Sequence, residues 1–396
     1  MKISRLHLLG YFVFITLGIN VAQLGPALQT LSQRTGSGIA ELGYIFAMMS
    51  VGYLASAPVI GSFRSNASLR PLLSASACIV VSLVMFIGAT SLWMVLLAAF
   101  LLGFGQACTQ VGFITLIGTQ MRDERDSSSQ LNRVNAFYGV GALIGPLLVA
   151  VSYRWMDSAL PAFWVAVVLD IVLLVIGLTM HLPAAPIVTH DDAGAAKSDA
   201  SLLRAPAMLA LIAMMAVYVG AEVAFSSWTT EFTRLATNVD IAAASLASSV
   251  FFGGLAFSRY FASVFLARAT PLRMLFVMLG VAACGVMLML LPFGSLPLTL
   301  LGSLLAGAGY GPVYPTLVST AIARFPQQAR SVSSMVTSAG SIGAVAIPAL
   351  TGNVIEAAGG LAIAWGMQLA LIAVMLMMLV GMRRTLLKSA VTVQAG

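Results

Sequence analysis

The stretch PAFWVAVVLDIVLLVIGLTMH at 161–181, followed by PAAPIVTHDDAGAAKSDAS at 183–201, decides the fold of this chain. The first run is apolar over the roughly 20 residues that a helix needs to cross the hydrocarbon of a bilayer. The second run is built of small and polar residues and carries Asp191, Asp192 and Lys197. Such a segment cannot be embedded in lipid, so it is predicted to be a linker between two membrane-embedded parts.

Apolar runs of similar length recur on both sides of this linker. Of the 396 residues, 60% are hydrophobic and 8% are charged, whereas about a quarter of a soluble chain is charged. We therefore predict an all-α membrane protein with twelve transmembrane helices in two pseudo-symmetric six-helix bundles, at 1–182 and 205–396, joined by a cytoplasmic linker at 183–204. The predicted spans lie near 8–33, 39–62, 71–90, 92–120, 132–152, 161–181, 205–232, 242–266, 271–291, 297–323, 332–355 and 361–382.

The net charge of +7 is explained by the orientation of the chain in the membrane rather than by binding to a nucleic acid. If the N-terminus lies in the cytoplasm, sixteen lysines and arginines fall on inner connections or tails, and three fall outside, namely Arg34, Arg154 and Arg234. This is the asymmetry of the positive-inside rule. It predicts that both termini are cytoplasmic and that the protein is a multi-pass protein of the inner (plasma) membrane, with the lipid bilayer as a partner.

Residue patterns of common enzymes and metal sites are missing. Cys78, Cys108 and Cys284 lie in apolar runs without metal-ligand spacing. The sequence contains no His-Glu-x-x-His, Gly-x-Ser-x-Gly or phosphate-loop pattern. We expect no metal, no cofactor and no enzymatic activity.

The two halves repeat a pattern of small residues and proline. Gly141, Gly145 and Pro146 in the fifth predicted span are answered by Gly340, Gly343 and Pro348 in the eleventh. The repeat suggests two related halves with a substrate site near mid-membrane. The alternative is that these residues only let helices pack closely.

Charged side chains inside predicted spans are candidates for function, because each costs roughly 2.5–3.5 kcal/mol at mid-bilayer. Glu222 in the seventh span shares a helical face with Tyr218 and Ser226, and Trp228 follows in the same run. An acid among hydroxyls and aromatic rings suits a cavity for a polar solute, and it can exchange a proton during transport. The alternative is a purely structural ion pair.

Two further charges lie in predicted spans. Arg259 in the eighth span can pair with Glu222 on the preceding helix, either for structure or to couple protonation to conformation. Asp170 in the sixth span has no accompanying polar stripe, so it can pair with another helix, stay protonated or relay protons. Glu222, Arg259 and Asp170 are the candidate proton-coupling residues.

In the predicted spans of the first half, the candidate polar side chains are mostly amides, whereas those of the second half include charged groups. Asn20 and Gln23 are three residues apart, and Gln106 and Gln110 are four apart, so each pair shares a helical face. Amides donate and accept hydrogen bonds, which suits hydroxyl- or amide-bearing ligands; the alternative is hydrogen bonding between helices. One more polar pair in the fifth span joins these candidates: Asn135 and Tyr138.

Two tyrosines of the tenth span lie in a proline-rich surrounding. Tyr310 and Tyr314 are four residues apart, and Pro312 and Pro315 interrupt helical hydrogen bonding between and after them. The prolines permit a bend or gate here. The rings either stack on a bound ligand or fill space beside the kink.

Five pieces of the sequence, in order over both halves, share a family pattern. They are Asn132 through Gly145-Pro146; Tyr218-Val-Gly-Ala-Glu222 with Trp228; Arg259; Gly309-Tyr-Gly-Pro312-Val-Tyr-Pro315-Thr316; and Gly340-Ser-Ile-Gly343 running to Pro348 and Gly352. With them the whole chain resembles transporters of the major facilitator superfamily. Its second half is most similar to the fucose/glucose/galactose:proton symporter subgroup and its bacterial relatives.

The resemblance implies that spans one, four, seven and ten line a central cavity and that the halves rock to expose it alternately. It would place seven side chains around the substrate: Asn20, Gln23, Gln106, Gln110, Glu222, Tyr310 and Tyr314. The chain departs from the subgroup because the acids of its first and fourth spans appear here as amides. Glu222 is then the best remaining proton carrier.

The predicted function is secondary active transport of a small polar or amphipathic organic solute, sugar-like by resemblance. We expect proton coupling through Glu222, and a monomer. The alternative is a proton-driven efflux pump for drugs or metabolites. Gly141 and Gly145-Pro146 resemble part of a drug:proton antiporter element, although Leu147 and Leu148 replace its trailing glycines.

Overall fold

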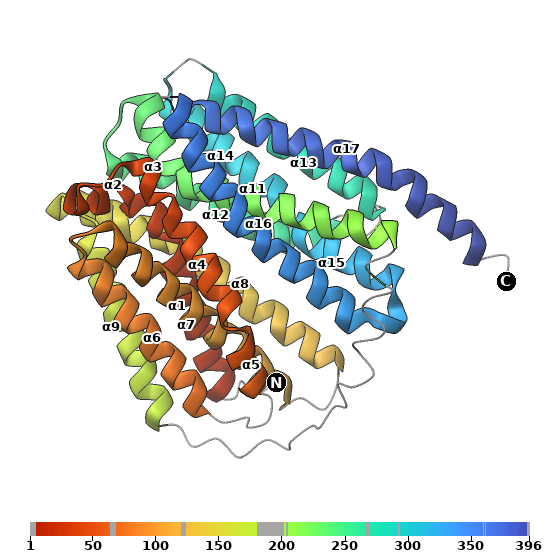
Figure 1. Ribbon diagram of the computed structural model, residues 1–396, viewed down its shortest axis with the longest axis horizontal. Helices are drawn as coiled ribbons and strands as arrows, with labels where there is room; N and C mark the ends of the chain where they lie inside the picture. Colours follow the sequence, from red (N-terminus) through yellow and green to blue (C-terminus); the bar gives the residue numbers. More distant parts are fainter. Residues whose placement is uncertain are drawn as a thin grey trace. The chain divides into compact units, whose positions relative to one another are not determined.

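The computed structural model describes residues 5–63, 69–119, 124–179, 202, 205–265, 270–291, 294–358, 360 and 362–393. Helices joined by short turns make up these ranges, and no strand occurs within them, so the predicted all-α class is confirmed. The helices (Figure 1) are α1 (Arg5–Ala22), α2 (Leu24–Thr35), α3 (Ile39–Leu42), α4 (Tyr44–Ala55), α5 (Ala57–Phe63), α6 (Leu69–Gly88), α7 (Leu92–Thr119), α8 (Glu124–Met156), α9 (Leu160–Thr179), α11 (Pro206–Thr237), α12 (Ile241–Phe265), α13 (Pro271–Leu290), α14 (Leu296–Tyr310), α15 (Val313–Arg324), α16 (Ala329–Ala358) and α17 (Ala362–Val393).

Most of these helices are long and apolar enough to cross a membrane. Within the described ranges ten helical segments meet this condition, and α1 with α2 makes an eleventh if the bent pair is one span. The described part of α6 includes a shorter apolar helix, Ser74–Gly88. A multi-pass membrane protein is therefore indicated, whereas the count of twelve spans and the cytoplasmic termini stay predictions.

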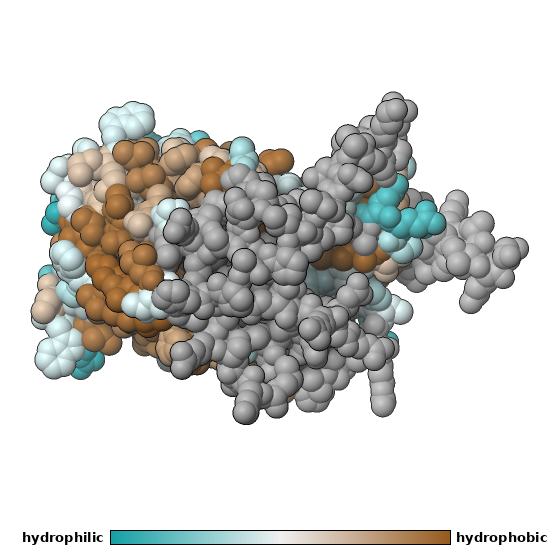
Figure 2. Space-filling model, turned by 90° about the horizontal axis from the view of Figure 1, so that it is seen from below, coloured by the Kyte–Doolittle hydropathy of each residue, from teal (hydrophilic) through white to brown (hydrophobic). Residues whose placement is uncertain are grey.

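The exposed surface of the helices suits contact with lipid. On α9, the side chains of three apolar residues are each more than half exposed on the surface of the protein: Trp164, Val168 and Leu178. Figure 2 shows broad hydrophobic areas on the coloured part of the surface. Burying such surface in hydrocarbon removes it from water, which accounts for a chain with so few charges.

The chain divides into two units of dense internal contact. Unit 1 comprises Met1–Thr189 and Ser226–Gly253, and unit 2 comprises His190–Phe225 and Gly254–Gly396. The boundaries between the units therefore fall inside α11 and α12. Apart from Leu202, the predicted linker at 183–204 lies outside the described residues, and the division into bundles at 1–182 and 205–396 stays a prediction.

In unit 1, a glycine contact brings α1 and α8 together. A Cβ atom added at Gly141 of α8 would collide with the carbonyl oxygen of Ile15 in α1. Here the absence of a side chain lets two backbones approach closely, as small residues do in membrane bundles. Other extensive contacts in this unit join α4 with α7, and α6 with both α7 and α9.

Unit 2 uses the matching glycine for the matching purpose. A Cβ atom added at Gly343 of α16 would collide with the carbonyl oxygen of Ala216 in α11. The repeated glycine pattern of the two halves thus serves close packing within each unit, as the packing alternative predicts. The contacts of α13 with α14 and α17 complete much of the rest of unit 2.

Among the described spans, proline explains two of the interruptions. Between α1 and α2 the chain bends by 49° at Gln23. Pro26 has no N–H to offer the carbonyl of Ala22, so one helical hydrogen bond is lost there. This bend is absent from the predicted span at 8–33. Between α14 and α15, Gly311 and Pro312 form a turn, where the interruption expected from the prolines is present.

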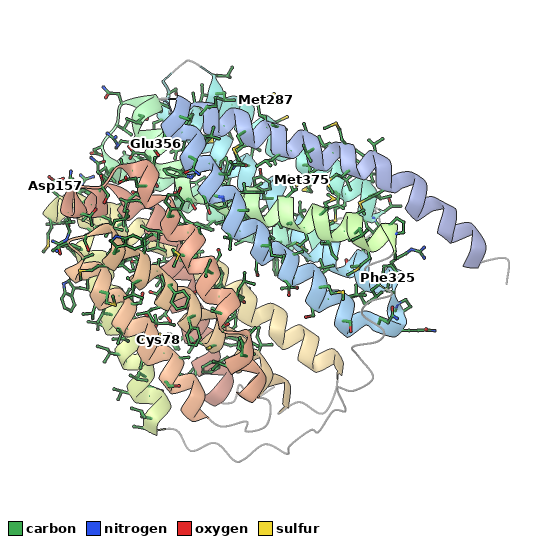
Figure 3. The ribbon with its side chains drawn as sticks, viewed as in Figure 1. Cys78, Asp157, Met287, Phe325, Glu356 and Met375 are labelled. Atoms are coloured by element: carbon green, nitrogen blue, oxygen red, sulfur yellow. The ribbon has the colours of Figure 1, made fainter. Side chains whose placement is uncertain are left out.

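Methionine fills several kinds of environment in unit 2 (Figure 3). Met375 of α17 is completely buried, whereas Met287 of α13 is half exposed. The side chain is flexible and apolar, so it serves as a core residue or faces lipid. Met375 thus packs in the core, whereas Met287 adds to the apolar surface.

Candidate functional site

A hydrogen-bonded ion pair in unit 2 connects α11 with α12. Arg259 Nη2 lies 3.5 Å from Glu222 Oε1. The hydroxyl of Tyr218, one helical turn before Glu222, donates to Glu222 Oε2. The side chains of Arg259 and Glu222 are 38% and 19% exposed, so the pair is only partly buried. The predicted partnership of these two residues is therefore present.

The ion pair also contacts the interruption between α14 and α15. Arg259 Nε donates to the carbonyl oxygen of Gly311 at 2.9 Å. The hydroxyl of Tyr218 lies 3.0 Å from the carbonyl oxygen of Tyr310. We call Tyr218, Glu222, Arg259 and the carbonyl groups of Tyr310 and Gly311 the unit 2 cluster.

Tyr310 is a core residue of unit 2. Its side chain is completely buried, and its hydroxyl donates to Gln368 Oε1 of α17 at 3.1 Å. Its ring lies against the rings of Tyr218 and Phe225. The ring thus packs beside the interruption, while its stacking on a bound ligand stays a prediction.

Gln368 was not among the sequence candidates. Its amide lies within the apolar block 361–382 and is almost completely buried. A lone amide in an apolar run was the available signal. Tyr314, in contrast, is half-buried, and its hydroxyl lies 3.2 Å from Thr337 Oγ1 of α16, so no contact with the unit 2 cluster is shown for it.

In unit 1, Asp170 has the helix partner that the sequence left open. Asn20 Nδ2 of α1 donates to Asp170 Oδ2 of α9 at 2.8 Å, and both side chains are buried. The hydroxyl of Thr16, one turn before Asn20, also hydrogen-bonds with Asp170. The carboxyl group is therefore surrounded by neutral donors rather than by a cation among the described residues that act on it.

The glutamines of unit 1 differ in their surroundings. Gln106 is buried, and its Nε2 donates to the carbonyl oxygen of Leu17 in α1 at 3.1 Å. Gln110 is half-buried and accepts from the Tyr53 hydroxyl at 3.1 Å. Gln23 is completely buried at the α1–α2 bend, and neither of its amide atoms bonds to a described residue. Gln106 and Asn20 thus make hydrogen bonds between helices, while a role in substrate binding stays a prediction for both.

From Ser226 onward, the residues of α11 belong to unit 1. Trp228 is completely buried in unit 1, with its ring close to Gly43. Further along, Thr230 hydrogen-bonds to Ser248 of α12, and Glu231 forms an ion pair with Arg234 at 2.6 Å. Tyr138 is half-buried in unit 1, and the side chain of Asn135 lies outside the described residues.

The Asn20–Asp170 contact carries a stability prediction. Replacing Asn20 by leucine leaves a buried carboxyl group without its donor and should lower the free energy of unfolding by about 1–3 kcal/mol. Replacing Asp170 by asparagine keeps an acceptor in place and should cost less than about 1 kcal/mol. Thermal unfolding of the purified variants in detergent measures both changes. Equal midpoints for the wild type and Asn20→Leu would contradict the structural importance of this contact.

Known structures share this fold. A crystal structure of a mutant nucleoside transporter NupG aligns with a TM-score of 0.80 and 14% identity, over 96% of this chain and 100% of that chain. A bacterial homolog to the human lysosomal transporter Spinster, inward-facing and unoccupied, aligns with a TM-score of 0.69 and 14% identity, over 95% of this chain and 94% of that one. Identities this low show the fold alone. Together with the many apolar helices of the described ranges, the shared fold indicates a multi-pass membrane protein.

The chain belongs to the Major Facilitator Superfamily, whose family model matches residues 9–348. A curated relative, Major facilitator superfamily domain-containing protein 4B of Danio rerio, is 30% identical over 148 residues. That match covers 36% of this chain and 27% of the relative, so the chain spans well under two thirds of the relative's length. The predicted superfamily is confirmed, and its members are transporters rather than enzymes.

Proposed function

We propose that this protein is a secondary active transporter that moves a small polar organic solute, coupled to protons through Glu222. The observation that carries the proposal is the part-exposed ion pair of Glu222 with Arg259, 3.5 Å apart inside the apolar spans α11 and α12. Charges inside a membrane are expensive to place and usually mark a pathway for substrate or protons. This pair is therefore the proposed coupling site.

The chemistry of the pair supports proton coupling. An ionised Glu222 attracts Arg259 and accepts a hydrogen bond from Tyr218, whereas a protonated Glu222 has no charge to hold the guanidinium. Binding or release of one proton thus changes the forces between α11 and α12. Asp170 is buried among neutral donors and is proposed as a secondary proton site.

Exposure refines the proposed substrate-binding residues. Side chains that are part-exposed are available to a solute, and these are Gln110 and Tyr138 in unit 1 and Tyr314 in unit 2. The completely buried candidates instead support the helices that carry these groups: Asn20, Gln23, Tyr218, Trp228 and Tyr310. Gln106 is almost as deeply buried and belongs with them. Amide and phenol groups suit a hydroxyl-rich, sugar-like solute.

Several finer features belong to this proposal. The sequence resemblance to the fucose/glucose/galactose:proton symporter subgroup supports a sugar-like solute and placement in the inner membrane. The proposed form is a monomer with twelve spans and both termini in the cytoplasm. The distribution of Lys and Arg supports this orientation of the termini.

The proposed substrate class has a direct test. The purified protein is screened for thermal stabilisation by sugars, amino sugars, nucleosides and hydrophobic cations, and each stabilising compound is offered to proteoliposomes that carry an inward proton gradient. Saturating ligand, at about 100 times its dissociation constant, should stabilise the folded protein by about 2.7 kcal/mol. We expect a neutral hydroxylated solute to stabilise the protein and to accumulate, and accumulation to vanish with a protonophore.

Two results would overturn the proposal. Stabilisation by hydrophobic cations alone, with their proton-driven expulsion, would establish efflux instead. Solute entry that never exceeds equilibrium, with or without the gradient, would establish facilitated diffusion. Proteoliposomes without protein provide the baseline for both measurements.

A further inference from the structure

The carbonyl group of Gly311 lies where the helix cannot supply its usual partner. In a continuous helix the N–H of residue 315 would donate to this oxygen, but Pro315 has no N–H. Arg259 Nε donates to it at 2.9 Å. Gly311 is itself buried, and buried backbone carbonyls need a partner. A side chain of α12 therefore replaces a missing backbone donor at the α14–α15 interruption.

The same guanidinium group carries the attraction to Glu222. Its Nε faces the carbonyl of Gly311, and its Nη2 faces Glu222 Oε1. The guanidinium is planar, with its donors in fixed relative directions. Arg259 can therefore reach both acceptors only from one position, and Glu222 contributes to holding it there.

The hydroxyl group of Tyr218 can donate its proton to either of two acceptors in the unit 2 cluster. These acceptors are Glu222 Oε2 and the carbonyl oxygen of Tyr310. An ionised carboxylate competes strongly for that proton, because hydrogen bonds to charged groups are the stronger ones. A protonated Glu222 can itself donate to Tyr218, which leaves the Tyr218 proton for the carbonyl of Tyr310.

We propose that Arg259 and Tyr218 are positioning residues that transmit the charge state of Glu222 to the α14–α15 interruption. While Glu222 is ionised, Arg259 stays paired with the Gly311 carbonyl and holds the interruption in the observed form. When Glu222 takes up a proton, Arg259 loses its counter-charge, turns its part-exposed side chain toward water and releases that carbonyl. The backbone around Gly311 then opens. This inference rests on the proposed function, because it takes Glu222 as the proton carrier.

Described residues of unit 2 face Glu222 from its own helix, from α12 and from α14. Tyr218 on its own helix and Arg259 on α12 bond to it directly, and Tyr310 on α14 lies close enough to interact electrostatically. Both tyrosines are phenols, with an ordinary pKa near 10, and the arginine stays charged. A response between acid and neutral pH that disappears on replacing Glu222 is therefore assigned to Glu222.

Hydrogen–deuterium exchange of the full-length protein in nanodiscs tests the transmission. Exchange of the α14–α15 peptides is compared at acid and neutral pH, and α13 serves as the internal reference that removes the chemical effect of pH. We expect exchange around Gly311 to be on the order of tenfold faster at acid pH, since local opening exposes the amides. Ser319→Ala, in α15 but outside the unit 2 cluster, should keep the full response.

Variants separate transmission from a merely structural role. Glu222→Gln should exchange fast at both pH values, because the neutral amide cannot hold Arg259. Arg259→Lys keeps a charge but loses the planar fork, so it should lose the response. Pro315→Ala supplies the missing N–H to the Gly311 carbonyl and should exchange slowly at both pH values while Glu222 and Arg259 remain.

The outcomes distinguish this inference from the proposed function. Equal exchange at both pH values in the wild type, or a response that persists in Glu222→Gln, would overturn the inference even if Glu222→Gln abolishes proton-driven accumulation. A response confined to intact Glu222, together with unchanged accumulation in Glu222→Gln, would support transmission and overturn the proposed coupling.

Discussion

Replacing Glu222 by glutamine is expected to abolish proton-driven accumulation of the substrate and to spare exchange of substrate across the membrane. Glutamine resembles the protonated acid in shape and charge but can neither take up nor release a proton, so uphill movement loses its coupling. A proton gradient of one pH unit is worth about 1.4 kcal/mol and supports about tenfold accumulation at a stoichiometry of one. In the variant the ratio should fall to one.

The measurement uses proteoliposomes loaded with and without substrate, under an imposed pH gradient and then without it. Glu356→Gln is the matched control, because Glu356 is exposed near the end of α16 (Figure 3) and is not a member of the unit 2 cluster. The control should accumulate substrate as the wild type does. Unchanged accumulation in Glu222→Gln would refute coupling through this carboxylate, and loss of both accumulation and exchange would point to a damaged binding site.

The second large effect is expected at the glycine contact between α11 and α16. Gly343→Ala adds a Cβ atom that would collide with the carbonyl oxygen of Ala216. Backbone cannot move aside as a flexible side chain does, so the two helices must separate. Overpacking of this kind should lower the free energy of unfolding by about 1–3 kcal/mol. Thermal unfolding in detergent is the measurement.

A matched glycine makes this prediction sharp. Gly280 lies in the middle of α13, and a Cβ atom added there would meet nothing within 4 Å. Gly280→Ala removes a flexible residue from a helix and should stabilise the protein by roughly 0.5–1 kcal/mol. The two identical chemical changes are therefore expected to have opposite signs. If both variants unfold at the same temperature, close packing of α11 on α16 does not limit stability.

The helical architecture could be predicted because its signals are local along the chain. A run such as 161–181 must cross lipid whatever its neighbours are, and α9 (Leu160–Thr179) lies where this run predicts a helix. The interruption after Tyr310 could also be predicted, because the prolines that lack an N–H lie in the same segment. The bend at Gln23 was readable from Pro26 but was not predicted.

The candidate site was only partly readable. The Glu222–Arg259 pair could be predicted because few charges in the spans were available to pair. Three other contacts could not be predicted, because their members are distant in sequence. They are those of Asp170 with Asn20, of Tyr310 with Gln368, and of Arg259 with the Gly311 carbonyl. An amide on a helical face looks the same whether it faces a solute or a neighbouring helix.

The all-helical, membrane-embedded architecture follows from the sequence alone, because apolar runs and prolines act within one segment. The resemblance to the superfamily rests on short motifs that occur in order along the chain. Only the tertiary structure decided which polar groups meet. It placed Asn20 against Asp170, Tyr310 in the core, and Arg259 between Glu222 and the Gly311 carbonyl. The physical reason is that a hydrogen bond needs atoms about 3 Å apart, and helix packing brings distant segments to that separation.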